Sequence, residues 1–109
     1  MQQWYMKALD ATPRPGQTDF FIGADVPGVG YMLNFFSWQP ARVLAGTTGC
    51  AIDHIGFEVR GLPEFRQRPE AKGIKLREPY RRAPEHGNIG VAALTDPWGT
   101  SIELTEGLR

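Results

Sequence analysis

Cysteine is almost absent from this chain, which limits how the fold can be held together. Of 109 residues only Cys50 carries a thiol, so no disulfide can form within the chain. This usage fits a reducing compartment, and we expect the protein in the cytoplasm. Cys50 itself is predicted to be a small buried hydrophobe, with a reactive thiol as the alternative.

An excess of charge and long apolar runs are also missing, and this excludes several partners. Twelve basic side chains balance twelve acidic ones, so we expect no basic patch for nucleic acid or for an anionic membrane surface. The apolar runs are far shorter than the ~20 residues that span a bilayer. The first residues form an aromatic, amphipathic segment instead of the charged and apolar regions of a secretory signal, so no signal peptide is expected.

Several catalytic signatures are absent as well. The sequence has no glycine-rich phosphate loop, no Ser-His-Asp order with a nucleophile elbow, and no cysteine pair for zinc. Its length predicts one domain over 1–109. What the chain does contain is a series of short segments with the periods of strands and helices.

The stretch 50–59 and its distant partner 101–105 give the clearest strand signals. In both, β-branched or aromatic residues alternate with polar or small ones. His54 and Glu103 each stand on the face turned away from the apolar side of their strand. If the strands are neighbours, these two side chains form half of a metal site. The same alternation predicts that Asp53 points to the opposite face and does not contact His54.

The remaining elements follow from spacing and turn signals. We predict helices over 2–10 and 61–73, the second broken near Pro69; strands over 18–24, 31–38, 74–78 and 88–95; and loops over 12–17, 39–49 and 79–87. The segment 96–99 predicts a tight turn before the last strand, and 106–109 a frayed tail. The order is helix, strand, strand, and then strand, helix, strand, strand, strand. If the first part is a copy of the second, the chain is a repeat of roughly fifty residues whose first copy has lost its opening strand.

Three segments of the second half resemble one known family. They read Asp-His-Ile-Gly-Phe-Glu-Val (53–59), Gly-Ile-Lys-Leu (73–76) and Leu-Thr-Asp-Pro-Trp-Gly-Thr-Ser-Ile-Glu-Leu (94–104). In order and spacing they are similar to the second module of vicinal oxygen chelate proteins, the superfamily of glyoxalase I, bleomycin resistance proteins and extradiol dioxygenases. Residues 4–37 resemble the first module more weakly.

The resemblance implies an α+β fold. Two βαβββ modules would form a curved, partly open mixed β-sheet around a metal or ligand. Residues 1–38 would be an incomplete first module that lacks its opening strand, 39–49 a linker, and 50–107 the second module. All three segments would belong to one glyoxalase-like domain.

In that family four metal ligands come from the first and last strands of each module, and two of these positions are filled here. His54 matches the histidine of the second module's first strand. Glu103 matches the glutamate of its last strand, which implies a catalytic role as well. The other positions are not filled, because the opening strand is missing and neither Leu33 nor Asn34 is acidic. The resemblance therefore implies either a divalent metal (Zn, Ni, Mn or Fe) held by His54 and Glu103, or a site without metal.

Other side chains are candidates for the pocket and for accessory roles. If the second face of the strand over 31–38 is not core, an aromatic-rich pocket is lined by Tyr31, Asn34, Phe36, Trp38 and Trp98. Glu58 shares the face of His54 and is a candidate acid–base group, with a solvated strand end as the alternative. Arg81, Arg82 and His86 fall in one predicted loop, which either closes over an anionic ligand or is simply solvated.

Two functions from different classes fit these observations. The first is a metal-dependent lyase or dioxygenase, in which the metal polarises vicinal oxygens of a small substrate. The second is a non-catalytic, drug-sequestering module of the bleomycin-resistance kind that binds a small, partly hydrophobic molecule. The unfilled ligand positions favour the second function, and the retained His54 and Glu103 favour the first. The missing strand leaves a sheet edge uncovered, so we expect a homodimer.

Overall fold

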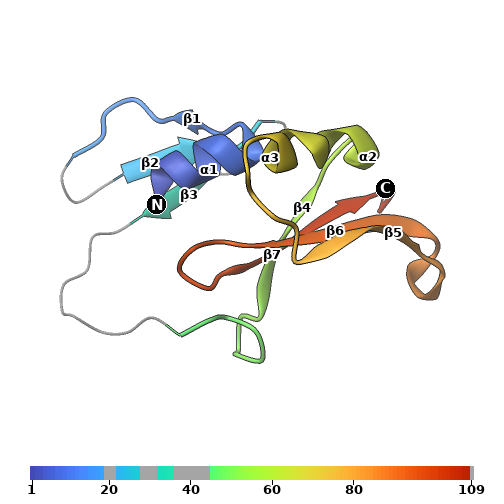
Figure 1. Cartoon of the computed structure of the whole chain (residues 1–109). Helices are drawn as coiled ribbons and strands as arrows, with labels where there is room; N and C mark the ends of the chain where they lie inside the picture. The colour runs from blue at the N-terminus through green and yellow to red at the C-terminus, as the bar shows by residue number, and fades with distance from the viewer. Residues whose placement is uncertain (19–21, 28–31, 36–44, 109) are drawn as a thin grey trace. The chain divides into compact units, whose positions relative to one another are not determined.

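The computed structural model describes residues 1–18, 22–27, 32–35 and 45–108, without the side chains of Met32 and Asn34 (Figure 1). The chain divides into two compact units, Met1–Val43 and Leu44–Arg109. Both combine helix and sheet, which confirms the predicted α+β class. No helix in the described ranges is long and apolar enough to cross a membrane.

The first unit is a helix followed by a three-stranded antiparallel sheet. It contains α1 (Gln2–Leu9), β1 (Thr12–Pro13), β2 (Ile22–Asp25) and β3 (Met32–Phe35), with the sheet order β1-β2-β3. The predicted first helix is confirmed, and its Tyr5 ring lies 5.2 Å from the ring of Phe35, centroid to centroid. Strand β1 was expected to be loop, because two residues are too few to show an alternating pattern.

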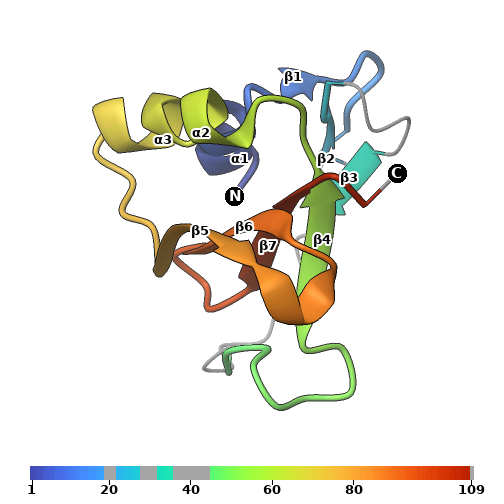
Figure 2. The same cartoon turned by 90° about the vertical axis from the view of Figure 1, so that its right-hand side faces the viewer.

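The second unit has the predicted order of strand, helix, strand, strand, strand. Its elements are β4 (His54–Glu58), α2 (Leu62–Phe65), α3 (Gln67–Ala71), β5 (Glu78–Ala83), the short 3₁₀ helix η1 (Pro84–His86), β6 (Ile89–Thr95) and β7 (Ser101–Glu106). The sheet order is β4-β7-β6-β5, in which β4 runs parallel to β7 and the other pairs are antiparallel (Figures 1 and 2). The first and last strands of the unit are therefore direct neighbours.

One face of this sheet packs against α2. Its fully buried side chains include Leu94, Ile102 and Leu104 of the sheet and Leu62 of α2. Glu106 Oε1 accepts hydrogen bonds from the backbone N–H groups of Gly61 (2.6 Å) and Leu62 (3.3 Å), which are free donors at the start of α2. The predicted fraying at Glu106 is therefore wrong, because this carboxylate ties α2 to β7.

The predicted strand over 74–78 is wrong. The strand lies further along the chain, at Glu78–Ala83, within the segment that was expected to be a charged loop. Its pairing register shifts between Glu78 and Arg81, so Pro79 lies in an irregular stretch where its missing N–H breaks no ladder bond. Strand β5 forms the edge of the sheet. Exposed charges and proline are typical of edge strands as well as of loops, which explains the error.

Two further boundaries differ from the predictions. The helix breaks at Arg66, so that Pro69 falls in the first turn of α3, where no N–H is required. Strand β4 begins only at His54, and Cys50 lies in the preceding bend. Cys50 is exposed, so the prediction of a buried residue is wrong, because the core-facing pattern of the strand does not reach it.

Candidate functional site

The pairing of β4 with β7 places His54 and Glu103 on one face of the sheet. His54 pairs with Ser101, and Gly56 pairs with Glu103. Because paired residues point to the same side, all four lie on the face opposite to the buried Ile102 and α2. We call this the site face. His54 and Glu103 are diagonal neighbours there.

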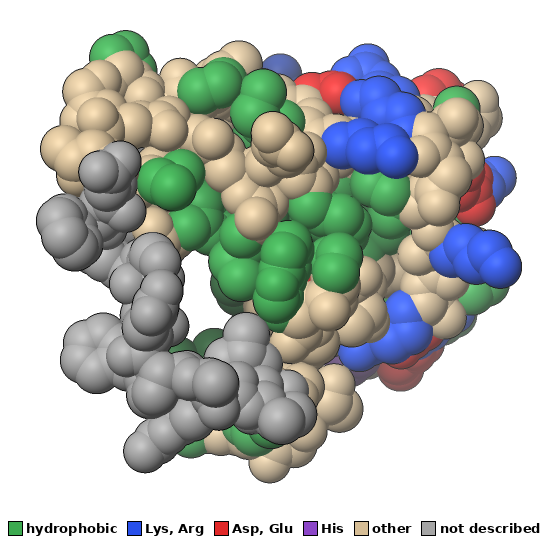
Figure 3. All heavy atoms as spheres, turned by 60° about the vertical axis from the view of Figure 1, so that its left-hand side comes forward, with side chains coloured by type: hydrophobic (Ala, Val, Ile, Leu, Met, Phe, Trp, Pro, Cys, Tyr) green, Lys and Arg blue, Asp and Glu red, His purple; other side chains and the backbone are tan. Residues whose placement is uncertain are grey.

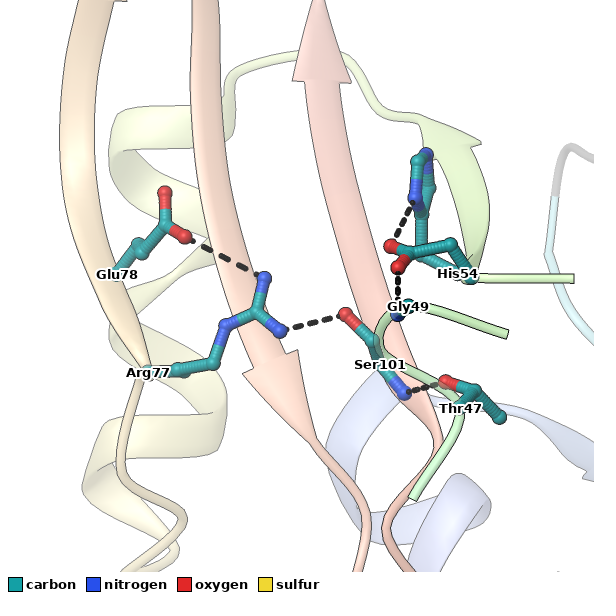
Figure 4. Close-up of polar contacts among 7 residues, drawn as sticks. Thr47, Gly49, His54, Arg77, Glu78 and Ser101 are labelled. Atoms are coloured by element: carbon teal, nitrogen blue, oxygen red, sulfur yellow. Dashed lines mark hydrogen bonds and ion pairs between the residues drawn. The ribbon is translucent and has the colours of Figure 1, made fainter. Parts of the chain in front are cut away.

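The imidazole of His54 is held by Asp53 (Figure 4). His54 Nδ1 lies 3.0 Å from Asp53 Oδ1, and the backbone N–H of Gly49 donates a hydrogen bond to the other oxygen of this carboxylate. The prediction that Asp53 does not contact His54 is wrong, because Asp53 lies in the loop before β4, where strand alternation does not apply. Two hydrogen bonds lower the pKa of Asp53, and the bond from the N–H of Gly49 has a larger effect than the bond with His54. A carboxylate at Nδ1 favours the tautomer with its proton there, which leaves Nε2 free.

The loop that carries Asp53 is attached to the start of β7 (Figure 4). The N–H of Thr47 donates to the carbonyl of Gly99 (3.0 Å), and the N–H of Ser101 donates to the hydroxyl of Thr47 (2.9 Å). Gly99 has a φ of 92°, and a Cβ there would lie 2.8 Å from the Cα of Gly46. This close contact needs glycine, and it holds the loop beside the site face.

A cavity of about 290 Å³ opens on the site face. It is lined by apolar Ile89, Val91 and Ala93 of β6, by Glu103 and Thr105 of β7, by Glu78 and Arg81 of β5, and by His86 of η1 and the exposed Leu108. Glu78 and Glu103 both pair with Ala93, so the two carboxylates flank a small residue. Sequence reasoning missed the contribution of β6. The sequence predicted a strand dominated by small residues over 88–95, but not which strands lie beside it.

Most charges at this cavity are already paired. Arg81 forms an ion pair with Glu85 (2.7 Å). The pKa of the Glu85 carboxyl is lowered most by a hydrogen bond from its own backbone N–H and next by the hydrogen bond from Arg81. Glu78 contacts Arg77 at 3.4 Å. The side chain of the half-buried Glu103 has neither a hydrogen bond nor an ion pair with any other residue in the described ranges. Glu103 is therefore the carboxylate at this cavity that is left to meet a ligand.

The predicted aromatic pocket falls largely outside the described residues. This applies to Tyr31, Phe36 and Trp38 and to the side chain of Asn34. Trp98 is half-buried in the turn before β7 and does not line the cavity. Arg81 and His86 do line it, although Arg81 lies in a strand and not in the predicted loop.

The described residues do not by themselves form a metal site. Within the ranges that the structure describes, no group of three or more His, Cys, Asp or Glu side chains lies close enough to hold an ion. Tight binding of a divalent metal usually needs at least three protein ligands. His54 and Glu103 supply two at most, so metal binding by this pair stays a prediction.

On the side of the surface drawn in Figure 3, Lys and Arg side chains lie beside acidic ones.

Comparisons with known proteins identify the fold. No family model and no curated protein matches the sequence. A member of the glyoxalase/bleomycin resistance protein/dioxygenase superfamily from Sphaerobacter thermophilus has a TM-score of 0.71 and 18% identity over 97% of this chain and 85% of its own. A domain of the same description from Frankia sp. EAN1pec has a TM-score of 0.71 and 23% identity, with 98% and 81% covered. The fosfomycin resistance protein FosX from Listeria monocytogenes has a TM-score of 0.70 and 16% identity, with 95% and 78% covered. The resemblance in the sequence is thus confirmed at the level of structure, and the chain has the fold of the vicinal oxygen chelate superfamily.

Proposed function

We propose that the chain binds a small, partly hydrophobic molecule on the site face of its four-stranded sheet. The observation that carries this proposal is the cavity that combines an apolar wall with the unpaired carboxylate of Glu103. Its volume is near the lower end of the roughly 300–1,000 Å³ of known ligand pockets, so it suits a compact molecule. Val91 and Ala93 would bury the apolar part of the ligand, and Glu103 and Thr105 would contact a polar part.

Binding of the neutral dye Nile red to the full chain tests this proposal. Ala93→Leu fills the cavity with additional apolar volume, and we expect the dye affinity to fall about fivefold, or about 1 kcal/mol. The matched control is Ala71→Leu, the same change at an exposed position of α3, which should leave binding unchanged. Val91→Thr keeps the side-chain volume but makes the lining polar, and it should also weaken binding. Absence of dye binding, or equal affinities for the Ala93 and Ala71 variants, would overturn the proposal.

A metal-assisted enzyme is the second candidate, and one observation favours it. Asp53 forms a hydrogen bond with Nδ1 of His54, so Nε2 remains available as a ligand atom on the face that also bears Glu103. The missing ligands would come from outside the described residues or from a second copy of the chain. Elemental analysis of purified protein tests this candidate. A stoichiometric Zn, Ni, Mn or Fe that is lost in His54→Ala would support it, and a metal-free protein that still binds the dye would support the binding module alone.

We also propose that the chain forms a homodimer. Strand β3 pairs with β2 on one edge and with no other described strand on its second edge. An uncovered edge favours pairing with another chain. Light scattering at low micromolar concentration should give twice the 12.1 kDa mass of the chain. A stable monomer would refute this proposal.

A further inference from the structure

We propose that the ligand of this cavity carries a positively charged amine, which binds Glu103 in the space above Gly56. This inference rests on the proposed function and adds the chemical class of the ligand. On the site face, β4 and β7 carry polar and acidic side chains, and the apolar side chains lie on the neighbouring β6.

Gly56 leaves a gap among polar side chains. His54 and Glu58 flank it along β4 on the same face, and Glu103 is its direct partner on β7. Gly56 is exposed, and a Cβ placed there would meet no atom of the described residues within 4 Å. The space over Gly56 is therefore open, next to the strand that carries Glu103, and a ligand group can enter it.

The charge around this gap is negative and uncompensated. Neither Glu58 nor Glu103 has a cationic partner among the described side chains. Glu58 accepts one hydrogen bond from the N–H of Leu108 (3.2 Å), which leaves its charge in place. A carboxylate or phosphate in the gap would be repelled, whereas an ammonium group would form charge-assisted hydrogen bonds with Glu103 and Glu58.

Arg81 and Arg77, two cations of this unit, are already engaged and do not reverse this preference. Arg81 lines the cavity but is paired with Glu85 at 2.7 Å. Arg77 donates to the hydroxyl of the buried Ser101 at 2.7 Å and contacts Glu78. His86 also lines the cavity, on the side of β5 and η1 and not on that of β4. An anionic ligand would have to displace one of these ion pairs, and an amine displaces none.

The apolar wall begins directly beside the acidic gap. Ala93 is the partner of Glu103 on the strand away from Gly56, and Val91 is the partner of the neighbouring Thr105. A ligand with its amine over Gly56 would thus lay its remaining part along Ala93 and Val91. The ligand class that fits is a primary or secondary amine joined to a compact apolar body.

Three probes of the same size test the charge preference. Benzylamine, benzyl alcohol and benzoate are titrated into the full chain, and amide chemical shifts of β4, β6 and β7 are followed together with displacement of Nile red. We expect benzylamine to bind about tenfold more tightly than benzyl alcohol and benzoate to bind most weakly. In Glu103→Gln the affinity for benzylamine should fall to that for benzyl alcohol. The control Glu64→Gln removes the same charge from an exposed position of α2 and should change nothing.

Gly56→Ala provides a second variant that spares the carboxylates. Gly56 is not among the residues with positive φ, so alanine is compatible with its backbone and the fold should be retained. The new methyl group occupies the gap, and the affinity for benzylamine should fall about threefold or more while Nile red still binds. Benzoate that binds as tightly as benzylamine, or an unchanged affinity in Glu103→Gln, would overturn the amine class. If Nile red binding persists in that case, the proposed function survives; if neither dye nor probe binds, both fail.

Discussion

The two units follow the same order of helix and three strands, but their last strands are paired differently. Strand β7 lies between β4 and β6, whereas β3 pairs only with β2 among the described strands. The additional strand β4 does more than widen the sheet, because it brings His54 and Gly56 beside Glu103. The candidate site is found where the last strand of a unit has a parallel neighbour.

The units also differ in the depth of their cores. In the second unit Ile102 and Leu104, on the central strand, are completely buried. In the first unit Leu33 and Phe35 of β3 are only half-buried. A strand with neighbours on both edges thus contributes more buried apolar surface, and we expect it to contribute more to stability.

Removal of a core side chain from each last strand tests this expectation most strongly. Leu104→Ala should lower the free energy of unfolding by about 2–5 kcal/mol, because it leaves a cavity in a closed core. Leu33→Ala makes the same change at a half-buried position and should cost about 1 kcal/mol. Urea denaturation of both variants measures the difference. Equal losses would mean that the two sheets are equally important for stability.

The close contact of two glycines in the second unit provides the next test. Gly99→Ala combines a positive φ with a Cβ close to Gly46 and should cost about 2–3 kcal/mol. Gly16 in the first unit also has a positive φ (76°), but no atom of the described residues lies within 4 Å of the Cβ that Gly16→Ala would add. Its cost should be about 1 kcal/mol, from the backbone conformation alone. If thermal unfolding shows equal losses, the Gly46–Gly99 contact does not hold the loop.

A smaller difference in stability is expected between the hydrogen bonds that attach each helix to its sheet. Glu106→Ala removes a charged acceptor from two N–H groups at the start of α2 and should cost about 1–2 kcal/mol. Gln2→Ala removes the single hydrogen bond from the Gln2 side chain to the carbonyl of Gly23 (2.7 Å), which joins α1 to β2. That neutral contact should be worth about 0.5–1 kcal/mol. Glu106→Gln retains an acceptor oxygen and should fall between the wild-type protein and Glu106→Ala.

The smallest effect is the response of the Asp53 contacts to acid. Because the pKa of Asp53 is lowered in the fold, its contribution is fully present above the ordinary carboxyl value of 3.8 and is lost as the pH falls through the lower folded value. The amide shift of Gly49 should therefore titrate below pH 3.8. A peptide spanning residues 47–55 serves as the unfolded control. If the titration midpoint is the same in the protein and in the peptide, the fold does not stabilise the ionised carboxylate of Asp53.

Local patterns in the sequence predicted much of the second unit. The faces of His54 and Glu103 follow from strict alternation within single strands, which is a short-range property. The failures lie where distant segments decide the outcome. Strand β5 is specified by its pairing with β6 and not by its own charged residues. The orientation of the Asp53 side chain depends on its hydrogen bond from the N–H of Gly49. The cavity depends on which strands are neighbours, and no local pattern reports that.

The position of β7 has a consequence for synthesis on the ribosome. This strand is the last of the unit to emerge, yet it occupies the interior of the sheet between β4 and β6. Until β7 is synthesised, β4 has no partner strand in this sheet, although β5 and β6 can already pair as a hairpin. Such non-local pairing raises the contact order and slows folding. The nascent chain therefore exposes the strand that bears His54 for longest, at the stage when misassembly with another chain is most probable.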